Sequence, residues 1–259
     1  MAKYIAMWSG PRNISTAMMR GWGSRPDTFV CDEPLYAHYL VATGHTDHPG
    51  YAETIRRHET DWRKVVEWLT GPVPDGKAIF YQKHMAHHLL ADMHLEWVSK
   101  LTNCLLIRDP ADVLRSLAEF LPSPTAEDTG LPNQVSLFHY IRGYIGTNPL
   151  VIDASDVLLN PRGMMAAMCR RLQVPFSEAM LNWPAGPRET DGAWAPYWYA
   201  KVDATTTFGP YRPQATPLPE HLRPVLDECH ELYGRLYQHR IAAETPIPES
   251  RPSAQALSS

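Results

Sequence analysis

The sequence lacks the long apolar runs and the basic surplus that mark several large classes of protein. None of its apolar runs approaches the roughly 20 residues that a membrane-spanning helix needs. The first of them, Tyr4–Trp8, is too short for a secretory signal peptide. The net charge is −4, so no overall positive field favours nucleic acid. We therefore expect a cytoplasmic protein that binds neither membranes nor nucleic acids.

Cysteine is scarce and is not arranged for metal binding or disulfide formation. The four cysteines (Cys31, Cys104, Cys169 and Cys229) are far apart and never form a CxxC pair. Three of them lie in apolar runs, which favours buried, reduced thiols over disulfides or a zinc site. Four histidines (His84, His87, His88 and His94) crowd one stretch, but their spacing contains no HExxH. We therefore expect no metal site.

Proline, in contrast, is abundant, with 24 residues in the chain. Residues 183–224 hold eight prolines with tryptophan and tyrosine between them, which is too aromatic for a disordered linker. Residues 183–217 are interpreted either as a lid over a binding site or as a wrap that only covers core. Residues 1–241 are expected to form a single domain, followed by a disordered tail at 242–259.

Short apolar segments alternate with amphipathic ones along the first two thirds of the chain. Strands are predicted at Tyr4–Trp8, Thr28–Cys31, Ala78–Tyr81, Asn103–Ile107 and Leu150–Ile152. Helices are predicted between them: one broken helix or two short ones over 51–71, one at 88–101, and one that Asp109 caps with Pro110 at its first position. Residues 153–160 are predicted to be a loop. The alternation is typical of a three-layer α/β fold with a central, mostly parallel five-stranded sheet.

Ionisable side chains follow four of the predicted strands. Arg12, Glu33, His84 and Arg108 each come just after one of them. Ligands of parallel sheets bind beyond the carboxyl ends of the strands. The four side chains therefore indicate one binding site at this edge of the sheet.

The stretch Lys3–Met19 has the form of an anion site. A buried strand stops at Ser9-Gly10-Pro11, and residues able to form a helix follow Arg12 to Thr16. The first N–H groups of a helix have no internal partner, and the helix dipole is positive there. A phosphate could therefore bind the turn, Arg12 and the hydroxyls of Ser15 and Thr16. An ordinary capped strand–turn–helix corner is the alternative.

Arg108 and Ser116 form a candidate second anion site. Arg108 ends the most apolar strand, and Ser116 lies about two helical turns later. An arginine fork and a hydroxyl together can hold a phosphate. The alternative is an Arg108 paired with Asp109 or Asp112 and a Ser116 that faces solvent.

These two elements together resemble the sulfotransferase family that uses 3′-phosphoadenosine 5′-phosphosulfate (PAPS), in its bacterial form. Pro11–Thr16 is similar to the family's P-[KR]-S-G-[ST]-T loop, with Asn13-Ile14 in place of Ser-Gly. Leu106–Leu117 is similar to its second element, an arginine at a strand end with a serine eight residues later. Val151–Phe176 is similar to a later strand–loop–helix segment, and Arg188–Trp194 is a loose, shorter analogue of a closing segment.

The resemblance implies a P-loop-like fold and a sulfuryl transfer from PAPS to a hydroxyl or amine of a small-molecule acceptor, without a metal. It implies that Arg12, Asn13, Ile14, Ser15 and Thr16 bind the 5′-phosphosulfate, and that Arg108, Ser116 and Arg188 bind the 3′-phosphate. Arg12 is also expected to stabilise charge on the bridging oxygen. The catalytic base is Glu33 or His84. Histidine has the better intrinsic pKa, but Glu-Pro at this place favours Glu33.

Two alternatives remain on the residues themselves. The first is a P-loop kinase or nucleotide hydrolase that uses ATP and magnesium, although Gly10 is not followed by the Gly-Lys of that motif. The second is a degenerate, non-catalytic member that binds a nucleotide, or a protein through the aromatic segment. The replacement of glycine by Ile14 is its main support, since isoleucine rarely adopts the conformations open to glycine.

Overall fold

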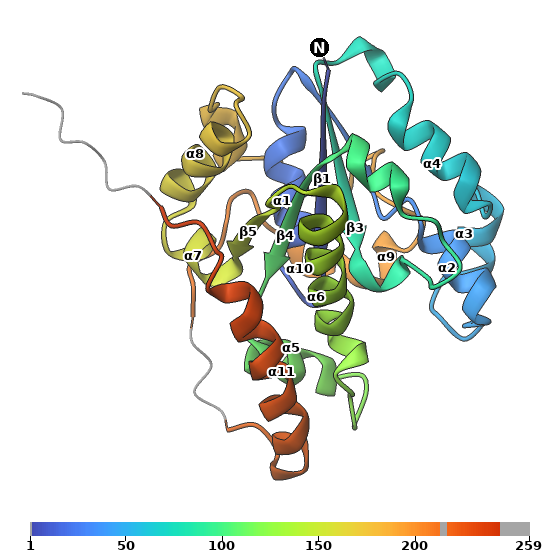
Figure 1. The fold of residues 1–259 in the computed structure, drawn as a ribbon, viewed down its shortest axis with the longest axis vertical. Coiled ribbons are helices and arrows are strands. Elements are labelled where there is room, and N and C mark those ends of the chain that lie inside the picture. The colour runs from blue at the N-terminus through green and yellow to red at the C-terminus, as the bar shows by residue number, and fades with distance from the viewer. Residues whose placement is uncertain (1, 213–216, 244–259) are drawn as a thin grey trace, which may run out of the picture.

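The computed structural model describes residues 2–212 and 217–243. The strands are β1 (Lys3–Ser9), β2 (Thr28–Asp32), β3 (Ile79–Met85), β4 (Thr102–Ile107) and β5 (Leu150–Asp153). They form a five-stranded sheet in the order β2-β3-β1-β4-β5 (Figure 1). Every neighbouring pair is parallel. The predicted α/β fold with a parallel five-stranded sheet is therefore confirmed.

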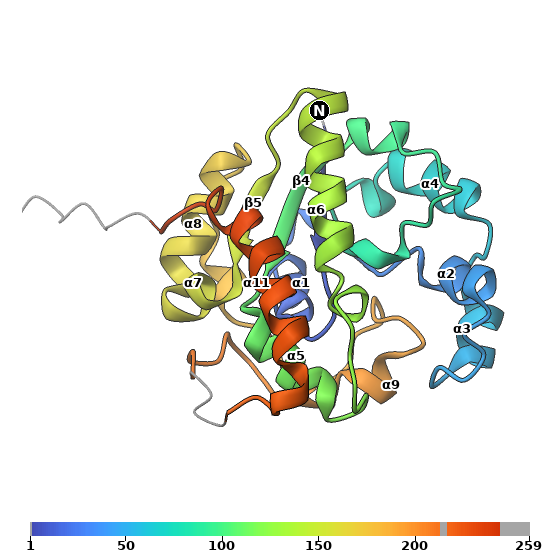
Figure 2. The ribbon, with the colours of Figure 1, turned by 60° about the horizontal axis from the view of Figure 1, so that its bottom comes forward.

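Helices cover both faces of this sheet. They are α1 (Ser15–Gly23), α2 (Tyr36–Thr43), α3 (Tyr51–Arg57), α4 (Trp62–Thr70), α5 (Pro110–Ala118), α6 (Leu131–Tyr140), α7 (Ala154–Leu159), α8 (Pro161–Arg171), α9 (Ala195–Trp198), α10 (Ala200–Asp203) and α11 (Arg223–Tyr237). Alternate residues of each strand point to opposite faces, so Trp8 packs with α6 and α11 while Met7 packs with α1 and α8. Figure 2 shows α6 and α11 side by side over one face.

Several local predictions are confirmed in detail. Asp109 caps α5 by accepting a hydrogen bond from the amide of Ala111 (2.8 Å), and Pro110 occupies the first helical position. The four cysteines, all within the described residues, are buried and free. The segment after Tyr51 forms two short helices, α3 and α4, in place of one broken helix.

Three local predictions were wrong. The segment 88–101 is not an α-helix: within the described chain it holds only the 3₁₀ turns Ala86–His88 and Glu96–Lys100 around buried Trp97 and Val98. The predicted loop 153–160 contains α7, which begins because Asp153 accepts a hydrogen bond from the amide of Ser155 (2.8 Å). Strand β3 continues to Met85, so its polar residues lie inside the strand.

Residues 183–212 form an ordered chain segment rather than an open loop. The segment contains α9 and α10, and the buried guanidinium of Arg20 in α1 binds Asp191 (2.8 Å) and Asp203 (3.0 Å). The amide of Gly192 donates to Asp32 at the end of β2 (3.1 Å). Residues 213–216 of the predicted lid and 244–259 of the predicted tail lie outside the described residues. Within the described chain, none of the helices is long and apolar enough to cross a bilayer.

The close approach of Gly10 to the loop before α6 gives a stability prediction. A Cβ atom at Gly10 would lie 2.1 Å from the carbonyl oxygen of Thr129, whereas one at Gly143 would meet nothing within 4 Å. We expect Gly10→Ala to lower the free energy of unfolding by about 1–3 kcal/mol, because backbone must move. Thermal unfolding should show a drop of about 2–4 °C per kcal/mol. The control Gly143→Ala should not lower the unfolding temperature. Equal effects of the two substitutions would show that the contact between Gly10 and Thr129 does not limit the size of residue 10.

Candidate functional site

The loop between β1 and α1 adopts a conformation that explains its unusual sequence. Arg12, not Ile14, carries the left-handed backbone, with φ of 57° against −87° at Ile14. Isoleucine therefore does not need the left-handed backbone at the position where the resembling loop has glycine. Asn13 fixes the turn: its side-chain amide donates to the carbonyl of Leu106 (2.9 Å), and its side-chain oxygen accepts from the amide of Ile14 (2.8 Å).

The N-terminus of α1 has the features of an anion site. Among the described residues, Ile14 supplies no side-chain cap to α1, and no acidic residue lies in the first turn. The N–H groups of the first turn therefore remain available to a ligand. Ser15 is buried at this end of the helix, beside Thr16, and both line a cavity.

The two predicted anion elements meet in space. The Nε of Arg12 donates to the hydroxyl of Ser116 (2.7 Å), although 104 positions separate the two residues. Arg108 donates from its guanidinium to the backbone carbonyl of Arg12 (2.5 Å). The ring of Phe120 lies 5.0 Å from the Arg12 guanidinium, and burial lowers the pKa of Arg12. Two cations and a hydroxyl are thus held together beside the start of α1.

A large cavity, of about 970 Å³, opens over these groups. Among the residues that line it are Pro11 to Ala17, Glu33, Tyr36, Tyr39, Lys83, Arg108, Ser116, Trp194, Trp198 and Tyr199. It therefore joins the loop after β1, the ends of β2 and β3, and the last turn of α5 with the aromatic segment 183–212. The predicted site residues Arg12 to Thr16, Glu33, Arg108 and Ser116 all face this one space.

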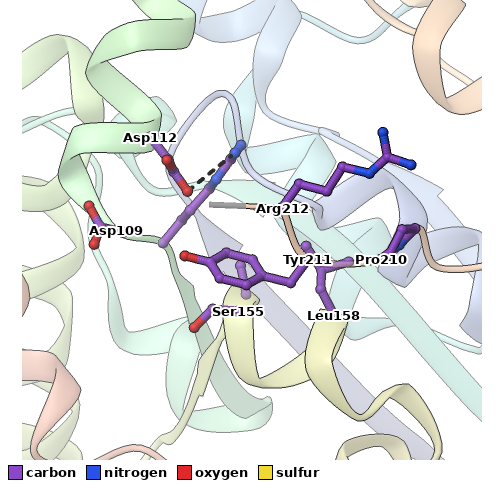
Figure 3. A pocket seen from close by; sticks show the side chains of 9 residues that line it. Asp109, Asp112, Ser155, Leu158, Pro210, Tyr211 and Arg212 are labelled. Carbon is purple, nitrogen blue, oxygen red and sulfur yellow. Dashed lines mark ion pairs between the residues drawn. The ribbon is translucent and has the colours of Figure 1, made fainter. Parts of the chain in front are cut away.

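A smaller cavity of about 160 Å³ lies next to it and shares Arg108, Leu158 and Pro210 with it. Figure 3 shows the ring of Tyr211 opposite Asp109, which caps α5, and Asp112 in the first turn of that helix. Arg108 and Asp112 form an ion pair across it, at 3.8 Å. The alternative expected for Arg108 is thus partly realised: this arginine contacts an acid while it also faces both cavities.

Arg188 is not at this site. Neither cavity, as the described residues define it, is lined by Arg188. Its guanidinium instead donates to the carbonyls of Gly186 (2.9 Å) and Pro187 (3.0 Å), within its own loop. The arginine that the C-terminal segment brings to the smaller cavity is Arg212. Sequence reasoning missed Arg212 because no motif surrounds it.

Glu33 lines the large cavity and has a strained backbone conformation. Its φ of 41° is unusual for a residue with a side chain and directly precedes Pro34. Two backbone hydrogen bonds hold it there: its amide donates to Lys83 (2.9 Å), and its carbonyl accepts from Tyr36 (2.9 Å). Backbone strain of this kind costs about 1–3 kcal/mol and persists where the surroundings impose it, often at functional sites.

A fully buried polar cluster surrounds Glu33. The Nζ of Lys83 donates to Asp32 (2.8 Å), to Glu33 and to the hydroxyl of Tyr199 (2.9 Å). The Tyr199 hydroxyl in turn donates to the carboxylate of Asp32 (2.7 Å). Two carboxylates therefore share one ammonium. Lys83, Asp32 and Tyr199 were not among the predicted site residues. The only signal for Lys83 was its place beside His84, and a buried polar residue inside a strand is not visible in an apolar pattern.

The charges of this cluster set its chemistry. Burial raises the pKa of Glu33, and the neighbouring Asp32 carboxylate raises it further, against the effect of Lys83. Burial alone would lower the pKa of Lys83, but the two carboxylates outweigh it and raise that pKa well above its usual range. Lys83 therefore stays protonated at neutral pH, while Glu33 is a stronger base than an exposed glutamate.

His84, the second predicted base, lies elsewhere. It is inside β3, where its ring stacks on Trp8 with centroids 4.2 Å apart, and its Nε2 lies 3.2 Å from the side-chain oxygen of Gln82. Burial lowers the pKa of His84 to about 3. It is not among the described residues that line the large cavity. The structure brings Glu33 to the predicted anion site and leaves His84 in the core.

Removing the Tyr199 hydroxyl tests the buried cluster. In Tyr199→Phe, Lys83 loses an acceptor and Asp32 a donor without access to water, so we expect a loss of about 1–3 kcal/mol in unfolding free energy. Chemical denaturation checks this. Tyr197→Phe is the matched control, since Tyr197 is exposed in α9, two residues before Tyr199, which follows that helix. A Tyr199→Phe protein as stable as the control would show that the cluster is not held as described.

Comparisons with known proteins point to one family. Residues 3–233 match the sulfotransferase domain family. Among solved structures, the sulfotransferase domain of the Synechococcus PCC 7002 olefin synthase has a TM-score of 0.51 at 15% identity, covering 88% of this chain and 95% of that domain. A sulfotransferase domain from the curacin biosynthetic pathway also has a TM-score of 0.51, at 13% identity, covering 93% and 99%. At these identities the structural likeness concerns the fold alone.

Two Arabidopsis thaliana proteins also match, named branched-chain-amino-acid aminotransferase-like proteins 2 and 1. Each is 35% identical to this chain, over 237 and 236 residues. The matches cover 91% of this chain but only 41% and 42% of the plant proteins. The chain thus spans about two fifths of the length of these curated relatives, whose names describe much longer proteins.

Proposed function

Because the chain belongs to the sulfotransferase domain family, we propose that it transfers a sulfuryl group from PAPS to a hydroxyl or amine of a small molecule. The observation that carries the proposal is the single large cavity shared by Arg12, Ser116, Arg108 and Glu33. The cations and helix N–H groups at one part of the cavity can bind an anionic donor. The carboxylate with a raised pKa at another part can take the proton that the attacking nucleophile must lose.

The residues of the β1–α1 loop fit the phosphosulfate part of such a donor. The uncapped first turn of α1 offers backbone donors, and Ser15 and Thr16 add hydroxyls. Arg12 carries a full positive charge close to them and is steadied by Ser116. Arg108 and the smaller cavity with Tyr211 and Arg212 are the proposed place for the 3′-phosphate and its nucleoside.

Glu33 is the proposed general base. It takes the proton from the acceptor hydroxyl or amine as the nucleophile attacks sulfur and the S–O bond to the 5′-phosphate breaks. Lys83 keeps Glu33 oriented through their buried ion pair. Arg12 stabilises the negative charge that develops on the bridging oxygen as adenosine 3′,5′-bisphosphate leaves. The sulfuryl group carries less charge than a phosphoryl group, so these side chains suffice in the proposal without a metal.

Incubation with ³⁵S-labelled PAPS and a panel of alcohols, phenols and amines tests the activity. We expect acceptor-dependent transfer of label that requires Arg12 and Glu33. In parallel, thermal unfolding with adenosine 3′,5′-bisphosphate in EDTA should show stabilisation that ATP with magnesium does not reproduce. Stabilisation only by ATP with magnesium would favour the kinase alternative. Tight binding of the bisphosphate without turnover of any acceptor would favour the non-catalytic alternative.

A further inference from the structure

One wall of the large cavity is made of imidazole and phenol rings that the proposed reaction does not use. This histidine wall consists of Tyr36, Tyr39, His45, His48, His87 and His88, from α2, the loop after it and the turn after β3. It begins next to the proposed base, because Tyr36 donates its backbone amide to the Glu33 carbonyl (2.9 Å). Glu33 and this wall line the same cavity, so one bound molecule can contact both.

His88 is the central residue of the wall. Its ring stacks on Tyr36, with centroids 5.0 Å apart, and lies 4.7 Å from the ring of Tyr39. His88 is 2% exposed and lines the cavity. Within the described chain, its Nδ1 is buried without a hydrogen-bond partner, as is Nδ1 of His87. Buried polar atoms in proteins nearly always have a hydrogen-bond partner, so a buried ring nitrogen without one needs an explanation. A bound ligand that supplies the missing hydrogen bond is one.

Both imidazoles are neutral. Burial lowers the pKa of His87 to about 4, and burial lowers that of His88 well below its usual range. A neutral imidazole offers one N–H donor and one ring-nitrogen acceptor, which is the complement of a hydroxyl group. Tyr36 is already engaged, since its hydroxyl lies 2.7 Å from Nδ1 of His48. Among the described residues of the wall, the buried ring nitrogens without a hydrogen-bond partner belong to His87 and His88.

The charges around the wall disfavour an anionic acceptor. The carboxylates of Glu127 and Asp128 line this cavity, and the pKa of Tyr39 is raised first by burial and then by the nearby charge of Asp128. The cation closest to the base, Lys83, is already bound by Asp32 and Glu33. An acceptor carboxylate or phosphate beside the described residues of this wall would thus meet like charge.

We propose that the histidine wall binds a second hydroxyl group of the acceptor, so that the substrate is an uncharged aromatic diol. One hydroxyl is presented to Glu33, and the other exchanges a hydrogen bond with the imidazole of His88, with His87 beside it. The aromatic ring packs among Tyr36, Tyr39 and Trp194, the last of which meets Tyr36 edge-on at 4.8 Å. This inference rests on the proposed sulfuryl transfer, since it names the acceptor for that site.

Matched phenols test the inference. Hydroquinone carries two hydroxyls, 4-methoxyphenol keeps one and blocks the other, and 4-hydroxybenzoate and tyramine add a negative or positive charge. With PAPS, we expect kcat/KM for hydroquinone to exceed that for 4-methoxyphenol by about tenfold or more. In His88→Phe, which preserves the stacking, this ratio should fall to near one while 4-methoxyphenol still reacts. An unchanged ratio in His88→Phe, or a preference for either charged phenol, would overturn the inference.

A binding measurement separates this inference from the proposed function and needs no variant. In the ¹⁵N-histidine-labelled wild-type protein, hydroquinone should shift the imidazole nitrogen resonances of His88, and 4-methoxyphenol should not. Such a shift without any turnover of PAPS would support the diol site and count against the sulfuryl transfer. Turnover without a His88 shift would retain the transfer and overturn the diol site.

Discussion

Arg12→Ala is expected to reduce acceptor-dependent sulfuryl transfer by about 10²–10³-fold, the usual effect of removing one donor aimed at developing charge. Arg12 lies beside the uncapped start of α1 and is held by Ser116. Without it, the charge that forms on the bridging oxygen would be stabilised by backbone N–H groups and Arg108 alone. Initial rates with labelled PAPS at saturating acceptor measure this loss.

Two further variants make the Arg12 result specific. Arg12→Lys keeps the charge but loses the Nε bond to Ser116, so its rate should lie between those of wild type and Arg12→Ala. Arg56→Ala removes an arginine that is exposed and pairs with Glu53 on the surface, and should leave the rate unchanged. Equal rates for Arg12→Ala and Arg56→Ala would show that Arg12 does not act on the transferred group.

Glu33→Gln is expected to lower the turnover by about 10²–10⁴-fold, the contribution typical of a positioned general base. The amide has the size of the carboxylate but cannot take a proton. Lys83 keeps Asp32 and Tyr199 as partners, so the variant should remain folded. Circular dichroism and the affinity for adenosine 3′,5′-bisphosphate serve as controls. A Glu33→Gln enzyme with near-wild-type turnover would exclude Glu33 as the base.

The pH dependence gives a separate test of the same residue. Glu33 acts only when it is deprotonated, so kcat/KM should fall as pH falls through its pKa. Burial raises that pKa above the ordinary glutamate value of about 4.3, so the fall should begin at a higher pH than for an exposed carboxylate. Glu33→Gln should lack this limb. If both enzymes show the same acidic limb, another group is responsible for it.

Much of the fold and part of the site follow from local patterns in the sequence. Apolar runs predicted the strands, and the pair Asp109-Pro110 predicted the start of α5, because both signals act over a few residues. That Arg12 and Arg108 face one site followed from placing each just after a strand, because parallel strands deliver their carboxyl ends to one edge. The place of Ser116 in that site came from the family resemblance.

The remaining features depend on contacts between distant residues. Lys83 and His84 are polar and so appeared to end β3. The strand continues through them because Lys83 donates to Asp32 and His84 stacks on Trp8 in the core. Ile14 appeared to conflict with the loop because local propensity cannot show that Arg12 takes the left-handed backbone. Arg188 and Arg212 both lie in a long proline-rich segment, and only the course of its backbone decides which of them reaches the smaller cavity. The segment has no periodic pattern from which that course could be predicted.

The buried, free state of all four cysteines has a practical consequence for spectroscopy on this protein. Native thiols with burial of this kind react slowly with maleimide reagents, so a cysteine introduced on the surface becomes the preferred point of labelling. Lys201 on α10 suits this purpose, because its side chain is 84% exposed and it lines the large cavity. A fluorophore attached through Lys201→Cys would report, in real time, whether the aromatic segment moves when a donor nucleotide arrives.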